Sequence, residues 1–147
     1  MSVKLIRISI VMVLVFTLFS MVGVAYAQEE HNHMHVSIDV KPGSYPNPIN
    51  LKSKGLIPVA LFGNSEFDVS QVNTASVTFG PMNHMDIGAS AVKFRSEDVN
   101  QDGYPDLLFF FKPILTGLQP SDTTACLHGT LWDGSHFCGH DEVRVIS

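Results

Sequence analysis

The sequence is poor in cysteine and in cations, and it lacks the common catalytic motifs. Its 147 residues hold two Cys, and nine Lys or Arg against fourteen Asp or Glu, which gives a formal net charge of −5. An excess of negative charge argues against nucleic acid and anionic membranes as partners. The motifs G-x-S-x-G and H-E-x-x-H and phosphate-binding glycine loops are absent, so we do not expect an enzyme.

Long hydrophobic runs are also scarce, and the longest stands near the N-terminus. Residues 8–24 are almost unbroken apolar sequence, preceded by Lys4 and Arg7 and followed by the small-x-small triplet 25–27. This pattern predicts a secretory signal peptide over residues 1–27, removed on export. The alternative is an uncleaved membrane anchor, since the run reaches the lower edge of spanning length. We expect a secreted, periplasmic or cell-surface protein with no membrane span after cleavage.

Cleavage would leave 120 residues with a net charge of −7, because Lys4 and Arg7 leave with the signal peptide. This is the length of one domain. Residues 28–35 are polar and rich in histidine, and they are predicted to form a flexible N-terminal tail. Residues 36–147 are predicted to form a single domain.

Short apolar stretches dominate residues 36–147, and helix signals are nearly absent. Residues 36–41 alternate apolar and polar side chains, as a half-buried strand does. Pro58 cannot donate a backbone hydrogen bond, so its strand is expected at a sheet edge or at a bulge. The main predicted strands are 36–41, 56–62, 75–79, 91–95, 107–112, 123–132 and 142–146. About eight short strands predict an all-β, immunoglobulin-like antiparallel β-sandwich.

Residues 98–106 read D-V-N-Q-D-G-Y-P-D and space oxygen donors as a calcium loop does. The candidate ligands are the side chains of Asp98, Asn100, Asp102 and Asp106 and the backbone carbonyl of Tyr104. Calcium takes six to eight oxygen ligands, and Gly103 stands where such a loop turns sharply and a Cβ would be in the way. Phe109 replaces the Glu of a complete EF-hand, so we expect weak affinity, on the order of 0.1–1 mM. The alternative is an acidic turn that binds no metal.

The segments 91–95 and 107–112 flank this loop and are predicted to pair as a hairpin with the loop at its tip. The loop resembles the shortened D-x-[DN]-x-D-G-x-x-D loops of dockerins and of integrin-type β-propeller repeats. Its strand–loop–strand setting is closer to the propeller type.

A wider resemblance runs along most of the chain after the signal peptide. Residues 36–63 read V-S-I-D-V-K-P-G-S-Y-P-N-P-I-N-L-K-S-K-G-L-I-P-V-A-L-F-G, and Phe67-Asp68, Phe79-Gly80-Pro81 and the acidic loop follow in order. This sequence resembles a poorly characterised family of secreted bacterial and archaeal β-domains marked by V-x-I-D-[IV]-K-P-G-S-x-P-N-x-I-N-L. The resemblance implies a secreted β-domain, often the end module of larger surface proteins, and it names no reaction.

Two cysteines in an exported chain suggest one disulfide. However, Asp133-Gly134 predicts a two-residue hairpin turn, in which Cys126 would face Asp141. Cys138 would then lie on the order of 10 Å along the strand, whereas a disulfide needs Cα atoms within about 7 Å. A Cys126–Cys138 disulfide therefore requires a bulge or a longer loop, and the alternatives are free thiols or bridges to another chain.

Histidines suggest a second kind of metal site, because imidazole, thiol and thioether groups suit copper or zinc. The candidate ligands are His31, His33, His35, His128, His136 and His140. Their spacings match no standard zinc motif, and the alternative is a set of surface histidines. We therefore expect a secreted calcium-binding module with a structural or binding role toward an extracellular or envelope partner. The alternative function is an exported copper- or zinc-binding protein.

Overall fold

The computed structural model describes residues 33–147, and the predicted signal peptide, His31 and most of the predicted tail lie outside the described residues. The fold is all-β, as predicted. No helix among residues 33–147 is long and apolar enough to cross a membrane. The elements are β1 (Met34–His35), β2 (Ile38–Val40), β3 (Pro48–Asn50), β4 (Ile57–Leu61), η1 (Val69–Gln71), β5 (Val72–Pro81), β6 (Ala89–Ser90), β7 (Lys93–Glu97), β8 (Asp106–Phe111), η2 (Pro113–Leu115), β9 (Thr124–Leu131), β10 (His136–Glu142) and β11 (Arg144–Ile146).

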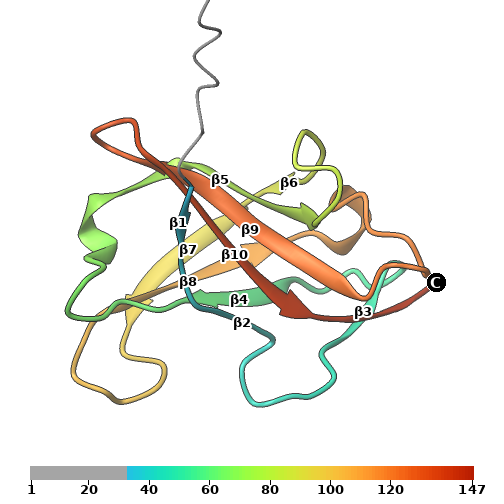
Figure 1. Cartoon of the computed structure of the whole chain (residues 1–147). Coiled ribbons are helices and arrows are strands. Elements are labelled where there is room, and N and C mark those ends of the chain that lie inside the picture. The colour runs from blue at the N-terminus through green and yellow to red at the C-terminus, as the bar shows by residue number, and fades with distance from the viewer. Residues whose placement is uncertain (1–32) are drawn as a thin grey trace, which may run out of the picture. The chain divides into compact units, whose positions relative to one another are not determined.

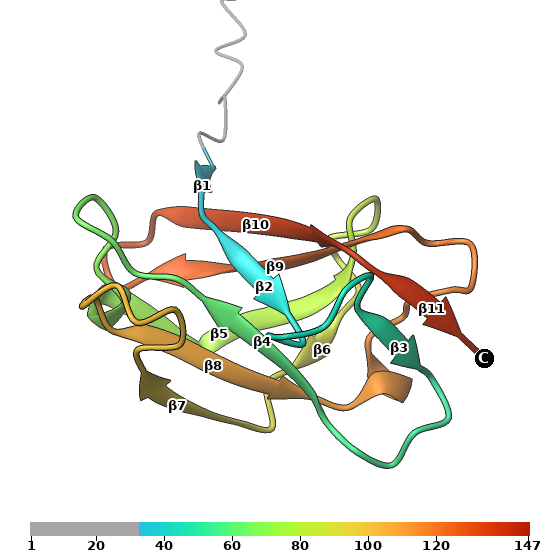
Figure 2. The same ribbon diagram turned by 90° about the horizontal axis from the view of Figure 1, so that it is seen from below.

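Two sheets carry most of these strands (Figures 1 and 2). The larger sheet has the order β1-β10-β9-β5-β6, and the smaller has the order β2-β4-β8-β7. Within both sheets the pairing is antiparallel except between β1 and β10. The strands β3 and β11 form a separate parallel pair.

Aromatic side chains join the two sheets in the core. Phe79 of β5 lies against Phe111 of β8, with ring centroids 5.3 Å apart, although the two strands belong to different sheets. Both side chains are fully buried, as are Leu127 of β9 and Phe137 of β10. Residues that alternate with these core positions face the other side of each strand. Several antiparallel sheets that share one core, with no barrel closure, are consistent with a β-sandwich.

The predicted edge position of β4 is wrong, since β4 lies between β2 and β8. The carbonyl of Pro58 accepts a hydrogen bond of 2.7 Å from the backbone N–H of Lys41. In an antiparallel strand the N and C=O of one residue point to the same neighbour. The nitrogen of Pro58 therefore faces β2 just beyond Val40, where β2 ends, and the ladder with β8 loses no donor.

The β7–β8 hairpin is confirmed, with Glu97 opposite Asp106, although β7 begins two residues later than the predicted segment 91–95. The predicted boundary at residue 36 needs correction, because Met34 and His35 already pair with β10. The predicted C-terminal strand over residues 142–146 also needs correction. Residues 136–142 form a complete strand, and residues 144–146 belong to the separate pair with β3.

Candidate metal sites and their supports

The acidic loop lies at the tip of the β7–β8 hairpin and is exposed to solvent from Asp98 to Pro105, apart from the half-buried Val99. Gly103 has a φ of +88°, as expected for the sharp turn of such a loop. A Cβ at this position would meet nothing within 4 Å, so backbone conformation and not lack of space favours glycine.

Side-chain oxygens of the loop fold back onto its own backbone. The two carboxylate oxygens of Asp98 accept hydrogen bonds from the N–H groups of Asp102 (3.2 Å) and Gly103 (2.9 Å). Asp102 in turn accepts one from Tyr104 (2.9 Å), and Asn100 makes a longer contact of 3.4 Å with the N–H of Asp102. These contacts fix three predicted ligands against the backbone of one turn, and each oxygen that accepts one hydrogen bond keeps a further lone pair.

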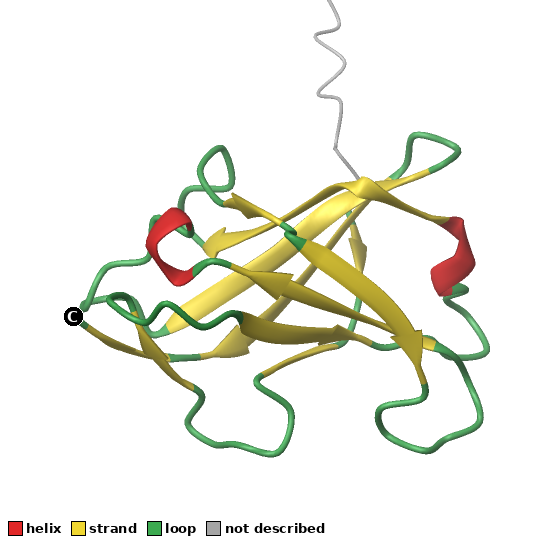
Figure 3. Cartoon of the chain, turned by 180° about the vertical axis from the view of Figure 1, so that it is seen from behind, coloured by secondary structure: helices red, strands yellow, loops and turns green. Residues whose placement is uncertain are grey.

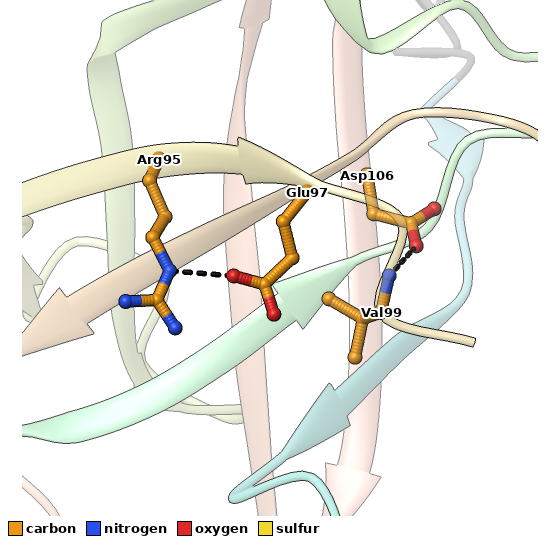
Figure 4. Close-up of polar contacts among 4 residues, drawn as sticks. All are labelled: Arg95, Glu97, Val99 and Asp106. Carbon is orange, nitrogen blue, oxygen red and sulfur yellow. Dashed lines mark hydrogen bonds and ion pairs between the residues drawn. The ribbon is translucent and has the colours of Figure 1, made fainter. Parts of the chain in front are cut away.

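Asp106 has a different role from the exposed acids of the loop. Its side chain is fully buried, and its two oxygens accept hydrogen bonds from Gly63 N–H (2.9 Å) and Val99 N–H (2.8 Å). Figure 4 shows the contact with Val99 beside the Arg95–Glu97 ion pair of β7. A Cβ on Gly63 would collide with the carbonyl oxygen of Pro105, so only glycine allows this close approach. Asp106 therefore ties the acidic loop to the segment after β4.

The donor set of the loop fits a hard cation such as calcium, because all of its candidate ligands are oxygens. Asp98 and Asp102 supply carboxylates and Asn100 a carboxamide, whereas both oxygens of Asp106 are engaged with backbone N–H groups. Within residues 33–147, no three His, Cys, Asp or Glu side chains are grouped so that they could hold a metal ion. Calcium binding stays a prediction.

Five of the six candidate transition-metal residues fall on one face of the larger sheet. In the strand register, His35 lies beside Cys138, and Cys138 lies opposite His128. These positions alternate with the buried core residues and so face away from the core. The five residues are His33, His35, His128, His136 and His140, which we call the histidine face.

The closest contacts within the histidine face involve three of these residues. The rings of His33 and His136 meet edge to face, with centroids 5.6 Å apart. Partial burial lowers the pKa of His128, and the neighbouring His33 and His136 lower it further, against an opposing hydrogen bond that the imidazole donates to the Met85 backbone. The His128 imidazole also lies 2.9 Å from the hydroxyl of Thr78. A lowered pKa favours the neutral imidazole, which is the form that binds metals.

The two cysteines approach each other because the hairpin register differs from the prediction. The N–H of Leu131 donates to the Ser135 carbonyl (2.9 Å) and the N–H of Gly134 donates to the Leu131 carbonyl (3.0 Å), so Trp132, Asp133 and Gly134 form a three-residue loop in place of a two-residue turn. Cys126 therefore faces His140 and not Asp141. The Sγ atoms of Cys126 and Cys138 are 2.8 Å apart, and both residues are free thiols in this structure. Burial, followed by the hydrogen bond with Cys138, raises the pKa of Cys126.

Sequence reasoning missed a polar cluster that involves the K-P-G-S-Y-P-N stretch. Asn47 is almost completely buried, and its Nδ2 donates to Asp141 Oδ2 (3.0 Å) and to the Glu142 carbonyl (2.7 Å). Asp141 Oδ2 also accepts from Val40 N–H (2.9 Å), and Tyr45 donates to Glu142 Oε2 (2.8 Å). Burial, and then the charge of Asp141, raises the pKa of the nearby Asp39. Asn47 and Asp141 are 94 residues apart in the chain, so no local sequence pattern could predict this cluster.

Comparison of the chain with known protein families, with curated proteins and with solved structures gives no match.

Proposed function

We propose that the chain is an exported, calcium-binding β-sandwich of immunoglobulin-like architecture with a structural or binding role at the cell surface or in the periplasm. The observation that carries the proposal is the turned acidic loop, in which Asp98 spans the backbone N–H groups of Asp102 and Gly103. Asp98, Asn100 and Asp102 would hold the ion together with the Tyr104 carbonyl. Asp106 would either support the loop through its hydrogen bonds to the backbone or act as a further ligand. Bound calcium would neutralise clustered carboxylates and hold the hairpin tip in one conformation.

The export part of the proposal rests on residues 1–27, and the binding role rests on the loop and on the absence of catalytic motifs. The resemblance to secreted β-domains agrees with both. The export part is tested separately by the intact mass of protein recovered outside the cytoplasm. That mass should correspond to a chain whose first residue is Gln28.

The calcium part is tested by thermal unfolding in chelator and in calcium. At a calcium concentration ten times the dissociation constant, the ion should raise the free energy of unfolding by about 1.4 kcal/mol, and therefore Tm by several degrees. Asp98→Asn with Asp102→Asn should abolish the rise, because asparagine keeps an acceptor for the loop N–H groups but removes the charge. Isothermal titration with calcium should show the same loss.

A matched control replaces two exposed carboxylates outside the loop, Glu66→Gln with Asp86→Asn. This variant has the same change in net charge and should retain the full effect of calcium. If both double variants respond to calcium as the wild type does, the loop is not the calcium site.

A second candidate function is binding of copper or zinc at the histidine face. The contact between His33 and His136, with His128 close enough to respond to both charges, favours it. Metal analysis of untagged protein separates the two proposals. Zinc or copper near stoichiometric amounts, lost in His128→Gln with His136→Gln but kept in the Asp98→Asn/Asp102→Asn variant, would support the second. If no bound or titrated transition metal depends on these histidines, the second proposal fails.

A further inference from the structure

A corner of the sandwich far from the acidic loop combines lysines with exposed aliphatic side chains. The connection between β3 and β4 and the turn η2 together line a pocket of about 320 Å³. Lys52, Lys54 and Lys112 border this pocket, and Leu51, Pro113 and Ile114 provide its apolar wall. Figure 2 shows the β3–β4 connection and the short η2 turn at the same end of the smaller sheet.

The aliphatic part of this corner is an adjacent pair on η2. Ile114 is 72% exposed and Leu115 is 59% exposed, the largest exposures among the aliphatic residues described. Pro113 before them is buried and anchors the turn, and the Thr116 hydroxyl donates to its carbonyl (2.8 Å). The pair is therefore held outward by the fold. We call Lys52, Lys54, Lys112, Ile114 and Leu115 the lysine tip.

The charge of the lysine tip is not neutralised within the described residues. The ion pair that the structure contains among residues 33–147 joins Arg95 and Glu97 on β7, away from the tip. No Asp or Glu lines the 320 Å³ pocket or the adjoining 190 Å³ pocket, where Lys41 contributes a further cation. Three exposed ammonium groups thus surround an apolar wall with no carboxylate between them.

Exposed acids also lie at the opposite end of the strands. Figure 3 shows the two 3-10 turns at opposite ends of the strands, and η1 follows Asp68 whereas η2 follows Lys112. The acidic end carries Glu66, Asp68, Asp98, Asp102 and Asp133, whereas Asp122 and Glu142 lie at the other end, in the connection after η2 and at the end of β10 beside Tyr45, and not in the lysine-lined pocket. The five residues of β4 that separate the ends span about 17 Å, twice the Debye length of about 8 Å at physiological salt. An anionic surface near the tip is therefore largely screened from the acidic end.

We propose that the lysine tip docks on an anionic phospholipid surface. The three lysines would lie at the phosphate groups, and Ile114 and Leu115 would enter the boundary between headgroups and acyl chains. A hydrated anionic polymer would leave both aliphatic side chains in water. A second copy of the chain would need roughly 800 Å² of surface per partner, far more than this apolar pair offers. The negative net charge of the whole chain argues against an anionic membrane as a partner. The lysine tip differs from the whole chain, because three lysines and no carboxylate line its pocket.

Co-sedimentation with vesicles tests the proposal, in chelator so that calcium plays no part. The protein is used as its host processes it, so that every variant shares the same N-terminus. Binding should rise with the fraction of phosphatidylglycerol in phosphatidylcholine vesicles and fall with added salt. The Lys52→Gln/Lys54→Gln/Lys112→Gln variant should bind at least tenfold more weakly, because each lysine near an anionic membrane is worth about fivefold. Ile114→Ser with Leu115→Ser should weaken binding severalfold.

A control at another site is Lys93→Gln with Val92→Ser, which removes one exposed cation and one exposed aliphatic side chain at β7 and should bind as the wild type does, whereas even a single Lys52→Gln should weaken binding about fivefold. Thermal unfolding confirms that each variant is folded, which is expected because all the altered side chains are exposed. Equal binding to neutral vesicles, or tip variants that bind normally, overturns the proposal. So does strong binding to soluble polyphosphate that ignores Ile114 and Leu115, or self-association without vesicles that the tip variants abolish.

Discussion

At the scale of single residues, Asp106 shows how a metal-ligand pattern and a structural support can share one carboxylate. Its position in the D-x-N-x-D-G-x-x-D series predicts a ligand, yet both of its oxygens accept backbone N–H groups inside the protein. A buried carboxylate is tolerated only where such hydrogen bonds replace water. The support of the loop is therefore built into the fold whether or not calcium is bound.

Replacing Asp106 with Asn should lower the free energy of unfolding by about 2 kcal/mol in chelator, because the new NH₂ group cannot accept from both Gly63 and Val99 and leaves one buried N–H unpaired. Chemical denaturation measures the loss. The exposed Asp98→Asn substitution serves as the comparison and should cost well under 1 kcal/mol in the same buffer. If Asp106→Asn is harmless in chelator and only removes the response to calcium, Asp106 is a ligand and not a support.

At the scale of elements, the β9–β10 hairpin depends on one residue of loop length. The predicted two-residue turn places Cys126 and Cys138 on opposite faces, because a shift of one residue inverts every side chain of a strand. In the three-residue loop Gly134 adopts a φ of +88°, and both sulfurs point to the same side of the sheet. The two cysteines thus become diagonal neighbours, the arrangement that a cross-strand pair needs.

We expect these thiols to oxidise to an intramolecular disulfide in an oxidising extracytoplasmic compartment. The disulfide should stabilise the protein by about 3 kcal/mol, because it closes a short loop in the unfolded chain. Intact mass after thiol labelling under denaturing conditions should show two unlabelled cysteines, and reductant should lower Tm. The Cys138→Ser variant should be indifferent to reductant. Full labelling of both cysteines in oxidised, unfolded protein would contradict the expectation.

The elements also show which parts of the fold are readable from the sequence. The alternation in residues 36–41 predicts β2, because one period-two face enters the core, and the short apolar runs around Val59 and Phe109 predict β4 and β8, which are buried on both faces. The pairs formed by β1 and β3 carry little apolar pattern of their own, and their partners are distant in the chain. The prediction of an edge strand at Pro58 fails for a related reason. Whether the missing N–H of Pro58 removes a hydrogen bond from the sheet depends on where β2 ends, which the local sequence does not show.

The candidate sites divide in the same way. The acidic loop is local in sequence, so its turn, the positive φ of Gly103 and its place on a hairpin could all be predicted. The histidine face, the lysine tip and the cluster around Asn47 each join segments that only the sheet register brings together.

At the scale of the whole molecule, the fold is closed by contacts between the β2–β3 connection and the end of β10. Asn47, with a φ of +57°, donates to Asp141 and to the Glu142 carbonyl, while Asp141 also accepts from Val40 at the end of β2. This cluster links a strand of the smaller sheet to a strand of the larger one. Asn47 Oδ1 is buried and has no hydrogen-bond partner among the described residues, so the amide is present for its donors.

The whole-molecule role of Asn47 can be separated from its backbone role by two substitutions. Asn47→Ala loses two donated hydrogen bonds but also removes an unpaired buried oxygen, so we expect a cost of about 1–2 kcal/mol. Asn47→Asp suits a positive φ nearly as well as Asn, but it places a second carboxylate against Asp141 and removes both donors. Urea unfolding at neutral pH should therefore rank Asp as more damaging than Ala, and the difference should shrink as the carboxylates are protonated in acid. The reverse order at neutral pH would mean that backbone conformation alone selects Asn47, and that the link between the two sheets contributes little.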